Sequence, residues 1–310
     1  PESILGTLGL DPLSLKTGGN WRRRYVGNIA HQRVWTYIGT TALPADPSIV
    51  TFDSVKTGRR APIWENVQHF PNMQPANPAL WRENVYQREA TEYTGNRAVT
   101  ETVTSGYVMA QGKLGREGLL ARTNFIAGVR REKTETESWG WVRARTPSTA
   151  AQQTADPIGS VQRDYANTQR RRQGDYTKSF PSAHLTHDVT SNLKARLAWS
   201  TSFGRPALSN AQPNETVNEA NQTLTVNNPS LLPQNARNWD ATLEYYFEPV
   251  GSVSVGWFYK RISDYIVTGI NNGTIGTGAD NGFNGEYPGF TLLSSANAGT
   301  AYVQGWEFSY

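Results

Sequence analysis

The sequence predicts an all-β protein: an antiparallel up-and-down transmembrane β-barrel with long extracellular loops, of which this chain supplies about eight or more strands. Three observations predict it. Apolar and polar side chains alternate with a period of two, short and long connections alternate along the chain, and glycine (28), tyrosine (14) and tryptophan (10) are abundant. The sequence contains no run of about 18 apolar residues, so no transmembrane helix is predicted. A barrel remains compatible with this, because alternation keeps the mean hydropathy of barrel strands low.

The clearest hairpin covers residues 239–260. In its first strand, apolar side chains alternate with polar ones, and EPVGS then forms a turn in which Pro249 and Gly251 supply constrained and permissive backbone positions. Apart from Phe258, the second strand repeats the alternation. The apolar side consists of Trp239, Ala241, Leu243, Tyr245, Phe247, Val253, Val255, Trp257 and Tyr259.

A second hairpin is predicted over residues 175–189 and 193–203, with a tight turn at TSN. One face of its second strand carries Lys194 and Arg196 beside serines. The other face consists of Leu193, Ala195, Leu197, Trp199, Thr201 and Phe203.

Further strands are predicted over residues 22–38, 98–114, 119–138 and 301–310, the last with its aromatic residues on one face. GREG, DVTSN and EPVGS are short connections, whereas residues 39–93, 139–173, 204–238 and 268–299 form long ones. Long structureless loops are uncommon in compact soluble domains. Short periplasmic turns alternating with long extracellular loops are typical of outer-membrane barrels.

Catalytic and metal sites are not predicted. The chain has no cysteine, and it has no G-x-S-x-G elbow. His184 and His187 are three residues apart in a predicted strand, so their side chains point to opposite faces. GADNGFNGE, residues 278–286, lacks the spacing of a calcium loop and is interpreted as solvated. We therefore expect no cofactor, no bound metal and no enzyme activity.

The net charge of +4 is modest, and the basic residues are concentrated in two runs, Arg22–Arg24 and Arg170–Arg172. Each run is consistent with a solvated charged face or with contact to an anionic surface or ligand. No nucleic-acid partner is expected.

Two other readings stay open at this point. A soluble or surface-exposed all-β binding protein, such as a carbohydrate-binding or adhesin-like sandwich, would also contain one-sided hairpins, with mostly short loops. A β-rich hydrolase would need two carboxylates about 5–10 Å apart in a cleft.

Three blocks of the sequence resemble TonB-dependent outer-membrane receptors. They are FPSAHLTHDVTSNLKARLAWSTSFGRP (residues 180–206), NNPSLLPQNARNWDATLEYYFEPVGSVSVGWFYKRISDYI (residues 227–266) and NAGTAYVQGWEFSY (residues 297–310), which ends in a "G-x-E" strand. Together they follow the family's order and spacing over the last part of the chain.

The resemblance implies a barrel of about 22 strands in the bacterial outer membrane, plugged by an N-terminal domain. That plug couples to the TonB–ExbB–ExbD energy complex. The implied function is active uptake of a scarce nutrient: a siderophore, haem, cobalamin or an oligosaccharide. Residues 1–310 are interpreted as a single β-barrel segment without a plug domain, an internal piece of a longer receptor.

The resemblance and the alternation together predict which side chains contact outer-membrane lipid and lipopolysaccharide. The predicted lipid-facing residues are Leu193, Leu197, Trp199, Leu243, Tyr245, Phe247, Val253, Val255 and Trp257. The aromatic, Asn-rich loops would suit a sugar, and Arg170–Arg172 would suit an anionic siderophore, but no ligand-binding residue is predicted.

Overall fold

The computed structural model describes residues 13–42, 49–51, 63–65, 69–218 and 220–310. These form two compact units. The first contains residues 13–28, 97–146 and 168–310, and the second contains the described parts of 29–96 and 147–167. Within the described residues, no helix has the length and apolar character needed to cross a membrane.

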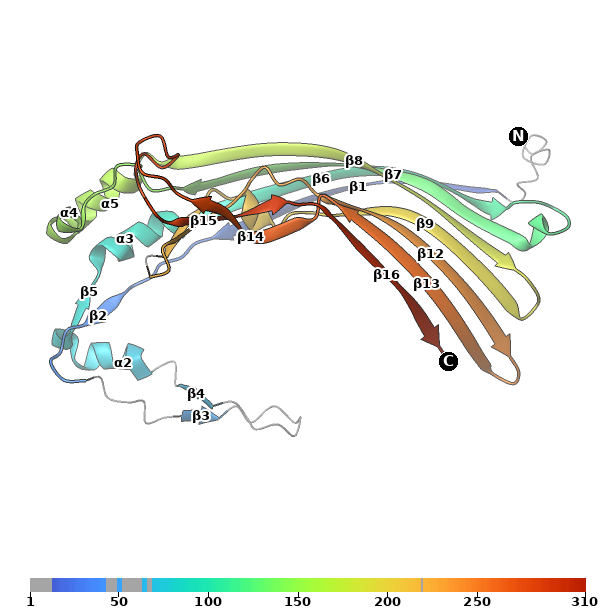
Figure 1. Ribbon diagram of the computed structural model, residues 1–310, viewed down its shortest axis with the longest axis horizontal. Helices are drawn as coiled ribbons and strands as arrows, with labels where there is room; N and C mark the ends of the chain where they lie inside the picture. The colour runs from blue at the N-terminus through green and yellow to red at the C-terminus, as the bar shows by residue number, and fades with distance from the viewer. Residues whose placement is uncertain (1–12, 43–48, 52–62, 66–68, 219) are drawn as a thin grey trace. The chain divides into compact units, whose positions relative to one another are not determined.

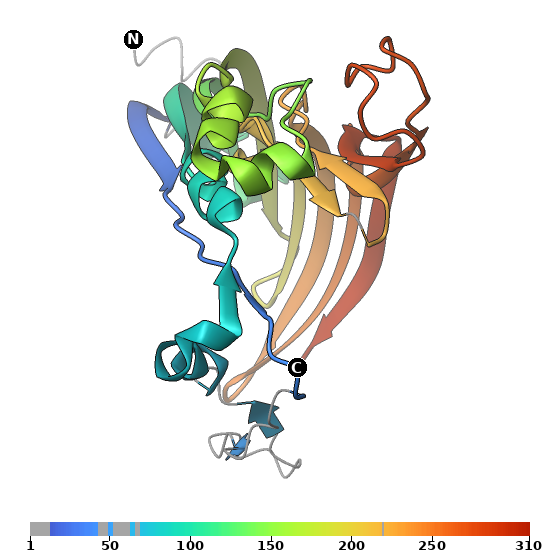
Figure 2. The same cartoon turned by 90° about the vertical axis from the view of Figure 1, so that its left-hand side faces the viewer.

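Eight strands form the main sheet of the first unit (Figure 1). Every neighbouring pair is antiparallel, and the sheet curves from one edge to the other (Figure 2). The outermost strands do not pair with each other, so the sheet is an open part of a barrel. In order, the strands are β1 (Ser14–Asn28), β6 (Arg97–Lys113), β7 (Thr123–Trp141), β8 (Gln169–Asp188), β9 (Leu193–Gly204), β12 (Gln234–Phe247), β13 (Gly251–Ser263) and β16 (Thr300–Ser309).

Connections at the two ends of this sheet differ in length, as predicted. The short ones join β6 to β7, β8 to β9 and β12 to β13; the first contains the 3₁₀ turn η2 (Leu120–Arg122). In the β8–β9 turn, the Thr190 hydroxyl accepts hydrogen bonds from the backbone N–H groups of Asn192 (3.2 Å) and Leu193 (3.0 Å). Such a side chain-to-backbone bond closes a turn without further residues.

Several strand boundaries differ from the sequence-based expectation. The strand expected at residues 22–38 is instead β1, which ends at Asn28. β8 begins at Gln169, so Arg170–Arg172 belong to a strand and not to a polar loop. Here both faces are polar, so alternation gives no signal, while pairing with β7 continues up to Trp141 opposite Gln169.

The long connections are not irregular throughout, contrary to expectation. They contain the short helix α6 (Leu208–Ala211) and a second sheet around a core of Leu224, Ile275, Tyr287 and Phe290. The order of this sheet is β10 (Glu215–Asn218), β11 (Thr223–Val226), β15 (Thr291–Asn297) and β14 (Ile266–Thr274). Strands this short, paired across distant segments, give little periodic signal.

The second unit consists of two segments that connect strands of the main sheet, β1 to β6 and β7 to β8. Asp164 is fully buried and joins these segments, because its carboxylate accepts hydrogen bonds from the Tyr86 hydroxyl (2.5 Å) and from the backbone N–H (2.8 Å) and hydroxyl (2.9 Å) of Ser148. The elements of the second unit are β2 (Trp35–Tyr37), β3 (Ile49–Thr51), β4 (Ile63–Glu65), α2 (His69–Ala76), η1 (Pro78–Leu80), β5 (Trp81–Glu83), α3 (Val85–Thr94), α4 (Ala150–Ala155) and α5 (Pro157–Tyr165).

The main sheet has two distinct faces, because residues directly opposite each other in an antiparallel pair lie on the same face. The inner face is defined by Ser138, whose hydroxyl donates to the carbonyl of Ala211 (2.6 Å) in the β9–β12 connection. In β7, β8, β9, β12 and β13 the even-numbered residues share this face, and the odd-numbered residues form the outer face. Phe203, near the end of β9, is an exception: it was predicted to share a face with Leu193, but its ring stacks on Phe180 of the inner face at 4.7 Å.

Phe258, the exception to the predicted alternation, lies on the inner face directly opposite Gly305 of β16. A Cβ atom at Gly305 would come within 2.8 Å of the Phe258 ring, so the glycine makes room for that ring. Gly256, on the same face of β13, has no atom closer than 3.8 Å to the position of a Cβ.

We therefore expect Gly305→Ala to lower the free energy of unfolding by about 1 kcal/mol relative to Gly256→Ala, because only the first forces a packed ring to move. Chemical denaturation followed by tryptophan fluorescence measures both. Equal stability of the two variants would contradict the packing described.

Candidate functional site

The structure brings all nine residues that were predicted to face lipid onto the outer face of three adjacent strands. Leu197 of β9, Ala241 of β12 and Trp257 of β13 are consecutive across the sheet. The neighbouring rows are Ala195–Leu243–Val255 and Leu193–Tyr245–Val253, followed by Phe247. Together they form a continuous apolar surface.

Aromatic rings lie at both ends of this apolar surface. At one end, Trp199 and Trp239 are directly opposite each other, with ring centroids 6.3 Å apart, and Tyr259 continues the row. At the other end, the Phe247 ring lies 6.3 Å from Tyr245 and 6.4 Å from Tyr310. Trp239 and Phe247 are eight residues apart on β12, which corresponds to about 27 Å along a strand.

The apolar surface extends beyond the nine predicted residues. On β16, Trp306 is 65% exposed and Phe308 75% exposed, and both lie opposite outer residues of β13. On the other side, Leu185 of β8 lies opposite Leu197. Leu185 was not among the nine predicted residues, because polar residues surround it in the sequence HLTH and no alternating apolar pattern marks its face.

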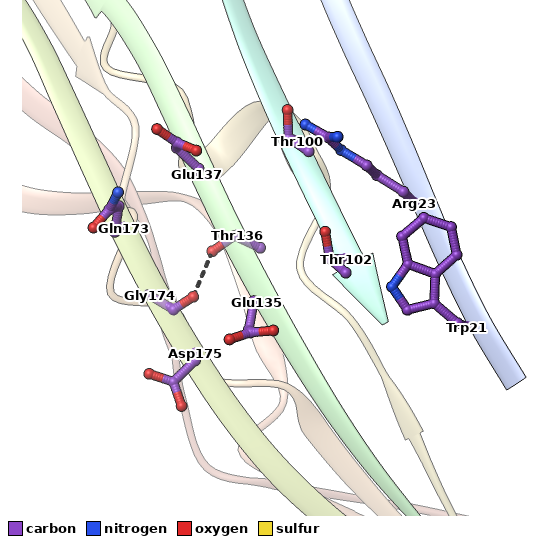
Figure 3. Close-up of a pocket in the computed structure, with 10 residues that line it drawn as sticks. All are labelled: Trp21, Arg23, Thr100, Thr102, Glu135, Thr136, Glu137, Gln173, Gly174 and Asp175. Atoms are coloured by element: carbon purple, nitrogen blue, oxygen red, sulfur yellow. Dashed lines mark hydrogen bonds between the residues drawn. The ribbon is translucent and has the colours of Figure 1, made fainter. Parts of the chain in front are cut away.

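Where the apolar surface ends, the outer face becomes polar within one step along each strand. Val129 on β7 is followed by Arg131, and Trp239 on β12 is preceded by Arg237. Figure 3 shows a polar depression of about 530 Å³ that lies beyond this limit on β1, β6, β7 and β8. It is lined by Trp21, Arg23, Thr100, Thr102, Glu135, Thr136, Glu137, Gln173, Gly174 and Asp175.

The inner face carries a cluster of charges around Arg205, at the end of β9. Its guanidinium pairs with the carboxylates of Glu101 (3.5 Å) and Glu132. Those side chains are only 5% and 3% exposed, and each has a second partner: Arg22 lies 3.4 Å from Glu101, and Arg130 lies 2.5 Å from Glu132. Because buried carboxylates are costly without a partner, this cluster fixes the β9–β12 connection over the sheet.

Aromatic rings hold Arg205 from the other side. Its guanidinium carbon lies 4.8 Å from the centre of the Phe203 ring, which stacks on Phe180 at 4.7 Å. A cavity of about 300 Å³ adjoins this cluster, and its lining includes Glu101, Tyr176 and Arg205 together with residues 206–208, 210–211 and 228–232. The sequence did not predict this site, because its members come from separate strands and are as far apart as Glu101 and Arg205.

The Arg170–Arg172 run is divided between the two faces. Arg172 lies opposite Ser138 and Arg170 opposite Gly140, so both belong to the inner face. Arg171 lies opposite Trp139 on the outer face. All three side chains are exposed, and none forms an ion pair within the described part of the chain.

Two arginines of the β7–β8 connection bind the second sheet. Arg145 pairs with Glu215 through both guanidinium nitrogens, and Arg143 donates a hydrogen bond to the Tyr287 hydroxyl (2.7 Å). Arg143 also lies 3.8 Å from the carboxylate of Glu286, whose oxygens accept no hydrogen bond. Burial raises the pKa of Glu286 above its ordinary value, although Arg143 and Arg145 oppose that shift.

Metal ligands do not gather in the residues that the structure describes: no three His, Asp or Glu side chains there are placed to hold a metal ion. His187 instead makes a 2.9 Å hydrogen-bond contact with the Thr123 hydroxyl.

Comparison with known families identifies the sheet. The family model described as "TonB dependent receptor-like, beta-barrel" matches residues 8–310. The chain belongs to this family. The resemblance read from the three sequence blocks is thereby confirmed, and so is the open barrel fold. A search among curated proteins gave no match.

Several solved TonB-dependent receptors are similar to this chain. One is a double mutant of the Serratia marcescens hemophore receptor HasR in complex with its hemophore HasA and heme: 14% identity, 74% of this chain, 33% of that chain, TM-score 0.48. Another is a mutant of the ferric enterobactin receptor PfeA of Pseudomonas aeruginosa, which is 11% identical over 69% of this chain and 34% of that chain, with a TM-score of 0.39. A third is the ferric-catecholate import receptor Fiu of E. coli K12, which is 14% identical over 69% of this chain and 26% of that chain, with a TM-score of 0.42. The chain spans about a third of the length of HasR and PfeA.

In this TonB-dependent receptor chain we expect Arg205→Met to lower the free energy of unfolding by about 3 kcal/mol, because it leaves two buried carboxylates short of a partner. Urea denaturation in detergent micelles measures the loss. Arg131→Met on the outer face is the matched control, with an expected change within about 0.5 kcal/mol. Similar losses in both variants would contradict the role given to Arg205.

Because the pKa of Glu286 is raised, we expect the stability of the protein to depend on pH. Its pKa is higher in the folded protein than in the unfolded chain, so its stabilising contribution is complete below the ordinary value of 4.5 and is lost as the pH rises through the folded-state pKa. Thermal melts across this range should show Glu286→Gln gaining stability relative to the unsubstituted protein as the pH rises. Curves that stay parallel would show that Glu286 does not titrate in this way.

Proposed function

We propose that this chain forms part of the barrel of an outer-membrane TonB-dependent receptor that takes up a scarce nutrient. The observation that carries the proposal is the apolar outer surface bounded by aromatic rows. Its length along β12, about 27 Å, fits the apolar band of about 25 Å that outer-membrane barrels present to lipid. Trp and Tyr side chains at the two rims suit the membrane–water interfaces.

On this proposal, the nine residues from Leu193 to Trp257 named above contact lipid. The short turns face the periplasm and the long connections face outward. Both units then belong to one barrel segment, because the second unit is made of two connections between barrel strands. A soluble binding sandwich is not favoured, since it would leave this surface exposed to water.

The proposed mechanism is transport without covalent chemistry. Ligand binds at the extracellular end, and a plug domain elsewhere in the receptor is pulled by the TonB–ExbB–ExbD complex. The polar inner face would contact the plug and water.

The charge of the inner face favours an anionic ligand, such as a ferric siderophore or haem. Arg170 and Arg172 are exposed there, beyond the buried Arg205 cluster, and among the described residues neither forms an ion pair with a carboxylate. Arginine binds carboxylate and phenolate oxygens through charge-assisted hydrogen bonds.

Leu197→Arg tests the membrane placement. Leu197 lies one row, about 7 Å, inside the aromatic row of Trp199 and Trp239, so a charge there should destabilise the barrel by about 1–2 kcal/mol, whereas Ala198→Arg, one residue away on the inner face opposite Asp240, should be tolerated. The readout is heat-modifiable gel mobility of the whole receptor extracted from membranes, in which a folded barrel runs faster unboiled. A receptor found soluble without a mobility shift, or equal tolerance of both substitutions, would overturn the proposal.

The arginine run supplies a test of the ligand. The double substitution Arg170→Gln with Arg172→Gln should weaken binding of an anionic ferric chelate about tenfold or more, because two charge-assisted contacts are lost. Titration of the whole receptor with haem and with ferric catecholate measures this. Arg171→Gln, on the outer face between them, should leave the affinity unchanged; an equal loss there would contradict an anion site on the inner face.

A further inference from the structure

Arg237 of β12 and Arg261 of β13 lie directly opposite each other on the outer face, and both are exposed. We propose that this pair binds the anionic phosphate groups of lipid headgroups in the outer leaflet. The inference rests on the proposed function, because it requires the outer face to be in a membrane.

A bound anion would stabilise this pair. Like charges on directly opposite residues of an antiparallel pair are destabilising, and an anion between them would offset that repulsion. Among the residues that the structure describes, no carboxylate forms an ion pair with either guanidinium. Arg261 contacts only the ring of Tyr302, with its guanidinium carbon 5.9 Å from the ring centre, which leaves the N–H groups of the guanidinium available.

The position along the strands suits a headgroup. Arg237 and Arg261 are each two residues beyond the aromatic row of Trp239 and Tyr259, which is about 7 Å further along the strand. Tryptophan and tyrosine occupy the interface, so the next step outward reaches the level of lipid phosphates. Guanidinium groups bind phosphate oxygens bidentately, and two adjacent guanidinium groups match a multiply charged headgroup.

The polar depression on β1, β6, β7 and β8 differs in charge from the arginine pair. On β7, Lys133 pairs with Glu135 (2.7 Å), and Glu135 lies opposite Asp175 of β8. The polar depression there is therefore rich in carboxylates (Figure 3). Its three carboxylates, Glu135, Glu137 and Asp175, outnumber the single guanidinium of Arg23, so the depression suits phosphate less well than the arginine pair of β12 and β13 does.

The test uses the whole receptor in phosphatidylcholine nanodiscs and measures binding of lipid A, which carries phosphate, and of dephosphorylated lipid A. The unsubstituted receptor should bind the phosphorylated form more tightly. Arg237→Gln and Arg261→Gln should each weaken that binding about fivefold. The double variant should lose more than either single variant, by a factor that need not be the product because the two side chains share one ligand. Lys260→Gln removes one positive charge from the inner face of the same strand and should have no effect.

The outcomes separate this inference from the proposed function. If the unsubstituted receptor is heat-modifiable and inserted but binds both forms of lipid A equally, the phosphate site is overturned while the membrane placement stands. The same conclusion would follow if Lys260→Gln weakened binding as much as Arg261→Gln does. A receptor that does not insert into nanodiscs would overturn the membrane placement, and the phosphate site with it.

Discussion

Hydrogen bonds between the antiparallel strands of the main sheet hold directly opposite residues on one face, and the remaining features depend on this register. A slip of one residue would exchange the two faces of a strand. In the observed register, Leu197, Ala241 and Trp257 meet on the outer face while Arg196, Thr242 and Gly256 meet on the inner one. The apolar surface, its aromatic rims and the inner charges are all products of that single alignment.

The inner face solves a different physical problem from the outer face. Near Ser138 the β9–β12 connection covers the inner face, so charged side chains there are removed from water and must be paired. Arg205 pairs with Glu101 and Glu132, and Arg145 pairs with Glu215, so connections distant in sequence are held to the sheet and to each other. Arg170 and Arg172, on the same face, stay exposed.

Sequence reasoning worked where one face is apolar and one polar. The hairpin of β12 and β13 and the strand β9 followed directly from alternation, and so did the nine outer residues. Sequence reasoning failed where both faces are polar, as at the start of β8 near Gln169. Pairing with β7, and not the side-chain pattern, sets that boundary. The Arg205 cluster and the second sheet depend on contacts between distant segments, and no local pattern records them.

The absence of cysteine from the chain permits a direct measurement of which face meets lipid. A fluorophore would be attached to Leu197→Cys or to Ala198→Cys in the whole receptor, reconstituted with lipids that carry bromine on their acyl chains. The account predicts strong quenching at position 197 and little at position 198. Equal quenching at both positions, or stronger quenching at 198, would contradict the assignment of the outer face.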